Sequence, residues 1–182
     1  HNNALIYGNA IITNRAIVCD DASVSDNVHI YEDAIVGDAA VIYGEAYLSG
    51  KSLVRGNAYV SGHAKVYDDA QVFGDANVTD GAVIKENALV YGNAVRDSTI
   101  VREKSQVYDE AMIYGTAQVN DMAIVCGKAW VYGDARVSGL SVVTGNAEVY
   151  ENADIYGKAV IDGNAHVYGK AEVASNATVE GQ

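Results

Sequence analysis

The chain has 182 residues and a formal net charge of −12, which argues against nucleic acid and anionic membrane surfaces as partners, because both attract Lys and Arg. No segment approaches the roughly 20 consecutive apolar residues of a membrane-spanning helix, and no targeting signal opens the chain, which leaves the cytoplasm and the cell exterior both open as locations. Hydrophobic residues make up 49% of the chain, yet it has one Trp and one Phe, which predicts a thin core of Ala and Val.

From the N-terminus an aliphatic residue recurs at every sixth position. The first run starts at Ile6, Ile12 and Val18 and ends at Val90, and its fifteen positions are all Val, Ile or Leu. Two positions before each aliphatic, or directly before it in the case of Ala94 and Val95, stands a small residue, which is Ala at all such sites except Val28, Ser52, Thr99, Ser105 and Ser141. A six-residue step does not follow one face of a helix, whereas residues two apart in a strand point to the same side.

A Gly-Asn or Gly-Asp pair commonly follows the aliphatic residue, and such pairs tolerate the positive φ angles of tight turns. Each hexad therefore predicts one short strand and one corner. The next aliphatic after Val90 should fall on residue 96, which is Arg96. If one residue is missing after Ala94, the phase resumes at Val95 and runs to Val179, with a break near residues 94–97. Fifteen and fifteen positions give thirty hexads in a single domain that covers residues 1–182.

The words VYGNA, IYGKA and VYGDA resemble the repeats of the hexapeptide-repeat superfamily. This resemblance covers nearly the whole chain, and it implies an all-β fold, a left-handed parallel β-helix (β-solenoid) with three hexads in each triangular coil. Thirty hexads then make about ten coils of 18 residues, and the strand spacing of ~4.8 Å predicts a rod roughly 48 Å long.

Stacking at a period of 18 places a set of apolar residues on one outer face. They stand directly before the inward aliphatic residues and are Ile17, Ile35, Leu53, Leu89, Ile124, Val142 and Val160, and Phe73 and Tyr91 extend the set. An outward apolar stripe of this length is typical of an interface, so a homo-oligomer is preferred over a face that an insertion or tail covers. The resemblance makes trimers plausible, because its members commonly trimerise through such faces.

A second set, Tyr114, Tyr132, Tyr150 and Tyr168, is predicted to form an aromatic ladder on another face. Stacked Tyr residues support neighbouring strands, which is the preferred interpretation, and the alternative is a platform for a sugar or a protein. Acidic pairs such as Asp20-Asp21 and Asp68-Asp69 fall at corners and are interpreted as solvated corners rather than a metal site. No metal and no cofactor is predicted.

The two cysteines, Cys19 and Cys126, fall six coils apart, about 29 Å at the strand spacing, which excludes an intrachain disulfide. The resemblance also raises acyl transfer, because many of its members are acyltransferases with a His general base between subunits. His63 is predicted at a corner, and His29 and His166 on strand exteriors. No catalytic motif of the family is matched, so no catalytic residue is carried over.

The preferred hypothesis is a non-catalytic structural rod that acts as a scaffold or a self-assembling subunit, because the hexads run without an inserted loop and both end coils expose strand edges. Its partners would be copies of itself, as a homo-oligomer or an end-to-end polymer, or another protein or a glycan. The alternative is an acyltransferase-like trimer with His63 as general base at a subunit seam, and the third hypothesis is a carbohydrate-binding rod.

Overall fold

The computed structural model describes residues 3–92 and 94–182, and these form thirty short strands in three parallel sheets of ten. Sheet A contains β1 (Leu5–Ile6), β4 (Ser23–Val24), β7 (Val41–Ile42), β10 (Tyr59–Val60), β13 (Asn77–Val78), β16 (Ala94–Val95), β19 (Met112–Ile113), β22 (Trp130–Val131), β25 (Glu148–Val149) and β28 (His166–Val167). Sheet B contains β2 (Ile11–Ile12), β5 (His29–Ile30), β8 (Tyr47–Leu48), β11 (Lys65–Val66), β14 (Val83–Ile84), β17 (Ile100–Val101), β20 (Gln118–Val119), β23 (Arg136–Val137), β26 (Asp154–Ile155) and β29 (Glu172–Val173). Sheet C contains β3 (Ile17–Val18), β6 (Ile35–Val36), β9 (Leu53–Val54), β12 (Gln71–Phe73), β15 (Leu89–Tyr91), β18 (Gln106–Val107), β21 (Ile124–Val125), β24 (Val142–Val143), β27 (Val160–Gly163) and β30 (Thr178–Gly181).

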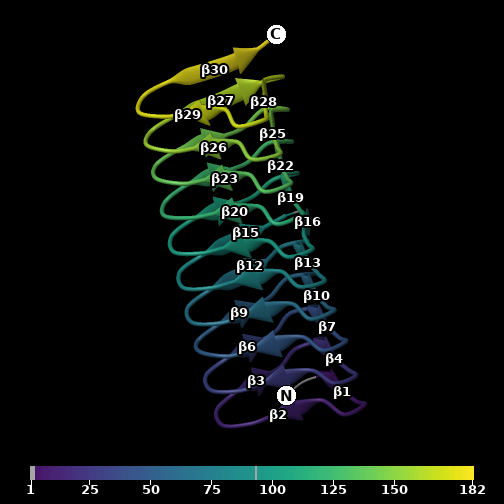
Figure 1. The fold of residues 1–182 in the computed structure, drawn as a ribbon. Coiled ribbons are helices and arrows are strands. Elements are labelled where there is room, and N and C mark those ends of the chain that lie inside the picture. Colours follow the sequence, from purple (N-terminus) through teal and green to yellow (C-terminus); the bar gives the residue numbers. More distant parts are fainter. Residues whose placement is uncertain (1–2, 93) are drawn as a thin grey trace.

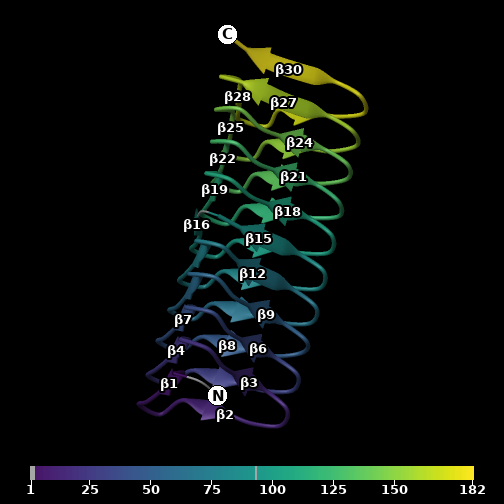
Figure 2. The same cartoon turned by 180° about the vertical axis from the view of Figure 1, so that it is seen from behind.

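Successive strands belong to sheets A, B and C in turn, so three strands complete one coil and the three sheets form the sides of a triangular rod (Figure 1). In the stacked coils, residues at equivalent positions of the hexad pair with one another, as Val60 in β10 does with Val78 in β13. The winding is left-handed, and the view from behind shows the same regular stack from the N-terminal to the C-terminal coil (Figure 2). The all-β solenoid of ten coils predicted from the hexads is confirmed. The described residues include no helix long and apolar enough to cross a membrane.

The aliphatic and small residues of the hexads fill the interior. Ile30, Val60 and Val131 have no exposed surface, and neither do the small-site residues Ala58 and Ala135. Each two-residue strand sends one side chain in and one out, which is why a single aliphatic residue in six is enough for the core. Burial comes almost wholly from the coils above and below, as in other repeat proteins.

One step of the stack is a residue short. Across it Ala94 pairs with Asn77 and Val95 with Val78, an offset of 17, whereas Val95 and Ile113 in the next step are 18 apart. The residue is therefore missing before Ala94 rather than after it, and Ala94 is the first residue of strand β16. The shift keeps Val95 paired with Val78 and Ile113 and therefore buried, because a slip of one residue would turn its side chain to solvent. Asn93 lies outside the described residues.

The corners are built on residues in the left-handed backbone region. Gly44, with φ of 78°, is typical, and a Cβ there would lie 3.0 Å from the backbone nitrogen of Gly62 in the next coil. Twelve corners use an acidic residue with positive φ instead: Asp20, Asp26, Glu32, Asp38, Asp68, Asp80, Glu86, Asp97, Glu103, Asp109, Asp121 and Glu151. A left-handed residue with a side chain costs roughly 1–2 kcal/mol, so these acids need a compensating interaction.

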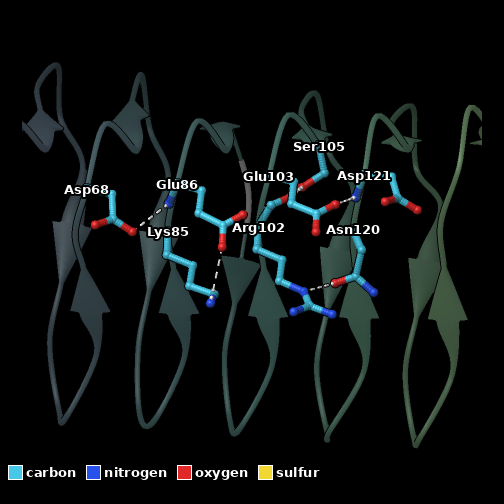
Figure 3. A network of polar contacts seen from close by, with 8 residues as sticks. All are labelled: Asp68, Lys85, Glu86, Arg102, Glu103, Ser105, Asn120 and Asp121. Atoms are coloured by element: carbon cyan, nitrogen blue, oxygen red, sulfur yellow. Dashed lines mark hydrogen bonds and ion pairs between the residues drawn. The ribbon is translucent and has the colours of Figure 1, made fainter.

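That interaction is a hydrogen bond to the next coil. In nine of these corners the carboxylate accepts the backbone N–H of the residue 18 positions on, at 2.6–3.3 Å. Figure 3 shows two examples, in which Asp68 accepts from the N–H of Glu86 and Glu103 from that of Asp121. The acidic pairs of the sequence are explained in this way, because the first member of each is a left-handed corner residue.

The net negative charge of the protein equals the charge of the twelve left-handed acidic residues at these corners. The chain has 24 acidic residues, and subtraction of the 12 left-handed ones leaves 12, which equals the number of Lys and Arg. The side chains outside the left-handed corners are therefore balanced in charge, and the value of −12 equals the corner contribution. Among the described residues no three His, Cys, Asp or Glu side chains converge closely enough to hold a metal ion.

Four small inward sites carry a buried hydroxyl instead of a methyl group. Ser105 and Ser141 donate to the carbonyl oxygens of Arg102 and Ser138 in their own corners, both at 2.7 Å. The hydroxyls of Ser52 and Thr99 are buried without a hydrogen-bond partner among the described residues. An unpaired buried hydroxyl is destabilising, whereas a paired one is mildly favourable.

Ser52→Ala should therefore raise the free energy of unfolding by about 1 kcal/mol, and Ser141→Ala should lower it by about 1 kcal/mol, because only the second change breaks a hydrogen bond. Both serines are fully buried at equivalent sites, which makes them a matched pair. Denaturant titration of the two variants measures the difference. Equal effects of the two changes would show that the corner hydrogen bond does not matter.

Asp121 gives a pH dependence of known sign. The carboxylate of Asp121 accepts the backbone N–H of Gly139 at 2.8 Å. This hydrogen bond, followed by a side-chain hydrogen bond with Glu103, holds the pKa of Asp121 below its usual 3.8. A lowered pKa in the folded state means that the charged carboxylate stabilises the fold above the unfolded value and that this contribution is lost as the pH falls through the folded pKa.

Asp121→Asn should consequently lower the free energy of unfolding at neutral pH, and the difference from the wild type should shrink as the pH falls below about 3.8. Denaturant titrations across this pH range test it. A difference that stays constant with pH would contradict the assignment of the effect to the charge.

Candidate interaction surfaces

Face C is the outer surface of sheet C, and its central row is formed by the residues that precede the inward aliphatics. All predicted interface residues lie on this face: Ile17, Ile35, Leu53, Phe73, Leu89, Tyr91, Ile124, Val142 and Val160. Ile17 and Tyr91 are exposed, and the other seven are half-buried, because each packs against the coils above and below while its outer side faces solvent. The structure thus brings the predicted residues together in one stripe.

Two apolar residues of face C were not found from the sequence. Met122 and Leu140 stand at the corners before β21 and β24, and they are 52% and 46% exposed. Together with Ile124 and Val142 they widen the stripe into a patch over two coils. The signal was the departure from the hexad consensus, since this corner position usually holds Asn, Asp or Lys.

Phe73 and Tyr91 widen the stripe in the middle of the rod. Their strands β12 and β15 are one residue longer than most, and the two rings pack at 4.9 Å between centroids with an interplanar angle of 36°. Leu53, Phe73 and the aliphatic part of Arg55 line a shallow groove of about 320 Å³ beside them. Face C is therefore apolar on both sides of the register shift.

Both cysteines are free and border face C. The thiol of Cys126 is buried and lies 3.2 Å from the hydroxyl of Thr144. Burial, and then the hydrogen bond to Asp20, raises the pKa of Cys19. Both residues therefore act as small packing groups at this edge.

The predicted aromatic ladder is present on sheet A. The centroids of Tyr114, Tyr132, Tyr150 and Tyr168 are separated by 4.8, 4.9 and 5.3 Å, and the rings are within 13° of parallel. The guanidinium of Arg96 lies 5.2 Å from the centroid of Tyr114 at the N-terminal end of the ladder. The faces of the inner rings are thus directed at one another, and their edges point outward. A sugar platform needs an open ring face, and the inner rings of the ladder do not offer one.

A groove beside the ladder was not found from the sequence. It has a volume of about 440 Å³ and is lined by Glu110, Met112, Lys128, Trp130, Asn146 and Glu148. Trp130 is 40% exposed, and its ring meets that of Tyr114 edge to face at 6.4 Å. The hydroxyl of Tyr132 donates to Glu148 at 3.0 Å, and burial, followed by this carboxylate, raises the pKa of Tyr132. Trp130 does not recur at a period of 18, since Met112 and Glu148 hold the equivalent positions, so the repeat pattern did not point to it.

The histidines occupy the positions predicted for them. His63 lies at the corner between sheets A and B, where its Nε2 is 3.1 Å from Oε2 of Glu45. His29 points outward from β5, and His166 points outward from β28, with its Nδ1 3.7 Å from Oε2 of Glu148. All three lie away from face C. His1 is outside the described residues.

No family model and no curated protein matches the chain. Among solved structures, LpxA from Acinetobacter baumannii is 16% identical with a TM-score of 0.47, over 98% of this chain and 71% of LpxA. A protein of Bacillus cereus to which acetyltransferase activity is provisionally ascribed is 14% identical with a TM-score of 0.24, over 97% of this chain and 78% of its own. These names lie nearer to the acyltransferase alternative than to a scaffold, but such values support no statement about activity. The hexads, the three sheets and the ten coils give the chain the fold of the hexapeptide-repeat left-handed β-helix proteins.

Proposed function

We propose that the protein acts as a rigid homo-oligomeric rod whose copies pack side by side through face C. The observation that carries this proposal is the composition of the central row, which has seven aliphatic residues in ten coils and no charged residue. An exposed apolar stripe that follows the full length of a solenoid is typical of an interface.

The size of face C suits a second copy of the chain. Ten coils at ~4.8 Å give a length of roughly 48 Å, and one side of the triangle, about five residues wide, gives roughly 16 Å. The product is on the order of 800 Å² for each partner, which is the contribution of one protein to an interface of standard size. A repeating ridge of aliphatic side chains is also complementary to a copy of itself, because both have the same spacing.

The distribution of charge points in the same direction. The two rows that flank the central row hold five cations, Arg15, Lys51, Arg55, Lys104 and Lys158, and four anions, Asp33, Asp69, Asp162 and Glu180. Face C therefore has a charge close to zero, while the corners hold the excess of acid. Two copies that repel elsewhere can approach on this face, whereas a strongly basic partner would be attracted to the corners.

Val142→Lys should shift the mass measured by light scattering toward the monomer across a concentration series, because it places a charge in the centre of the apolar row. Gln118→Lys is the matched control, since Gln118 occupies the equivalent outward position of sheet B and is half-buried like Val142. Circular dichroism confirms that both variants fold. A wild-type monomer at all concentrations, or an equal effect of the two changes, would contradict the proposal.

Acyl transfer is the second candidate, and the observation that favours it is the contact between His63 and Glu45. A carboxylate 3.1 Å from Nε2 can fix the imidazole ring and leave Nδ1 free to accept a proton, which is the arrangement of a general base. Copies that pack face C against face C would leave His63 on the opposite corner, so this candidate requires a different seam.

If His63 is a general base, the wild-type protein should turn over acyl-coenzyme A compounds, and the His63→Ala variant should lose this activity while its oligomer stays intact. His29→Ala is the control, because His29 is also exposed but, among the described residues, forms no ion pair with a carboxylate. An unchanged rate in His63→Ala would remove His63 from this role.

A further inference from the structure

The groove on sheet A has the chemistry of a cation site. It runs across β19, β22 and β25, and each coil contributes two of the six lining residues named above. The floor is Met112, Trp130 and Glu148, which are the outward residues of the three strands. The groove is separate from face C, and nothing in the homo-oligomer proposal involves it.

Trp130 gives the centre of the groove an aromatic surface. The ring is 40% exposed, and its contact with Tyr114 is edge to face, so the contact does not use parallel stacking as in the ladder. An ammonium group over the face of a Trp ring is attracted by the ring quadrupole, and Trp is the best of the aromatic residues for this contact.

Carboxylates lie at the two ends of the groove. Glu148 is held in place by the hydroxyl of Tyr132 at 3.0 Å, and Nδ1 of His166 lies 3.7 Å from the same oxygen. Glu110 is two coils away, about 10 Å along the axis at the strand spacing, and its carboxylate is 3.5 Å from Nζ of Lys128. Both members of this ion pair are 65% exposed, and such pairs are weak enough to give way to a ligand.

We propose that this groove binds a linear polyamine, with one ammonium group at Glu148, the chain over Trp130 and a second ammonium group toward Glu110. Three features select this ligand: two carboxylates separated along the groove, an aromatic ring between them, and Met112 beside the ring for the methylene groups. The net charge of −12 attracts a polycation toward the protein from a distance.

The test uses spermidine and the fluorescence of Trp130. The chain has one Trp, so selectively excited Trp emission reports on this groove alone. Spermidine should change the emission in a saturable way, and added salt should weaken the effect. Glu148→Gln keeps the acceptor for Tyr132 but removes the charge, and it should weaken binding about fivefold.

Glu172→Gln is the matched control. Glu172 is also an outward strand residue that accepts a hydrogen bond from a tyrosine, Tyr156 at 3.3 Å, and it lies on sheet B away from the groove. This variant should bind spermidine as the wild type does. Trp130→Leu, measured by calorimetry, should bind more weakly than the wild type.

Three outcomes would overturn the proposal. Spermidine that leaves Trp130 emission unchanged would show that the groove is not occupied. Equal weakening in Glu148→Gln and Glu172→Gln would show attraction to the overall charge rather than a site. An equal response to pentanediol or N,N′-diacetylchitobiose, which are neutral, would show that the groove does not select an ammonium group.

Discussion

The fold depends on one local constraint, which is that the chain must turn through a left-handed residue at every corner of the triangle. A turn every six residues leaves only two residues for each strand, and neither of them can supply the bend. Glycine adopts the required conformation at little cost, whereas most other residues need an additional interaction. Here Asp and Glu obtain that interaction from the backbone N–H of the next coil, as Glu32 does with Gly50 at 2.6 Å. The corners therefore contribute to the stacking as well as to the turns.

This constraint explains the separation between the inside, the faces and the corners of the rod. The interior holds one aliphatic and one small residue from each hexad, which makes it too uniform to contain a site. The faces hold the outward strand residues, and these vary freely, so that Ile124 on sheet C and Trp130 on sheet A occupy equivalent positions with different surroundings. Interaction surfaces arise where such residues line up over several coils. Face C and the groove beside the tyrosine ladder are the two places where this occurs most clearly.

Much of this architecture could be predicted from the sequence, because a strict six-residue repeat determines which residues of adjacent coils pair. Residues such as Val60 and Ala58 were assigned to the interior from spacing alone, and the stripe from Ile17 to Val160 followed from the same count. The position of Ala94 could not be obtained in this way. The sequence shows that one residue of the repeat is missing near Ala94, but only the pairing of Ala94 with Asn77 shows that it is missing before Ala94. Trp130 and Glu148 were missed for another reason. Their relation involves unlike residues in adjacent coils, and a search for repeats finds only like ones.

The acidic corners give one edge of the rod a line of closely spaced carboxylates. Along the edge between sheets B and C, four successive coils carry Asp68, Glu86, Glu103 and Asp121, which places one negative charge at about every 4.8 Å (Figure 3). This spacing is shorter than the Debye length of about 10 Å at 0.1 M salt, so neighbouring charges on an edge are not screened from each other. Such a line of charge attracts cations, and the protein supplies some of them itself, because Nζ of Lys85 lies 3.3 Å from Oε1 of Glu86 (Figure 3). The carboxylates that have no such partner should gather mobile cations in a stripe along this edge, parallel to the rod axis.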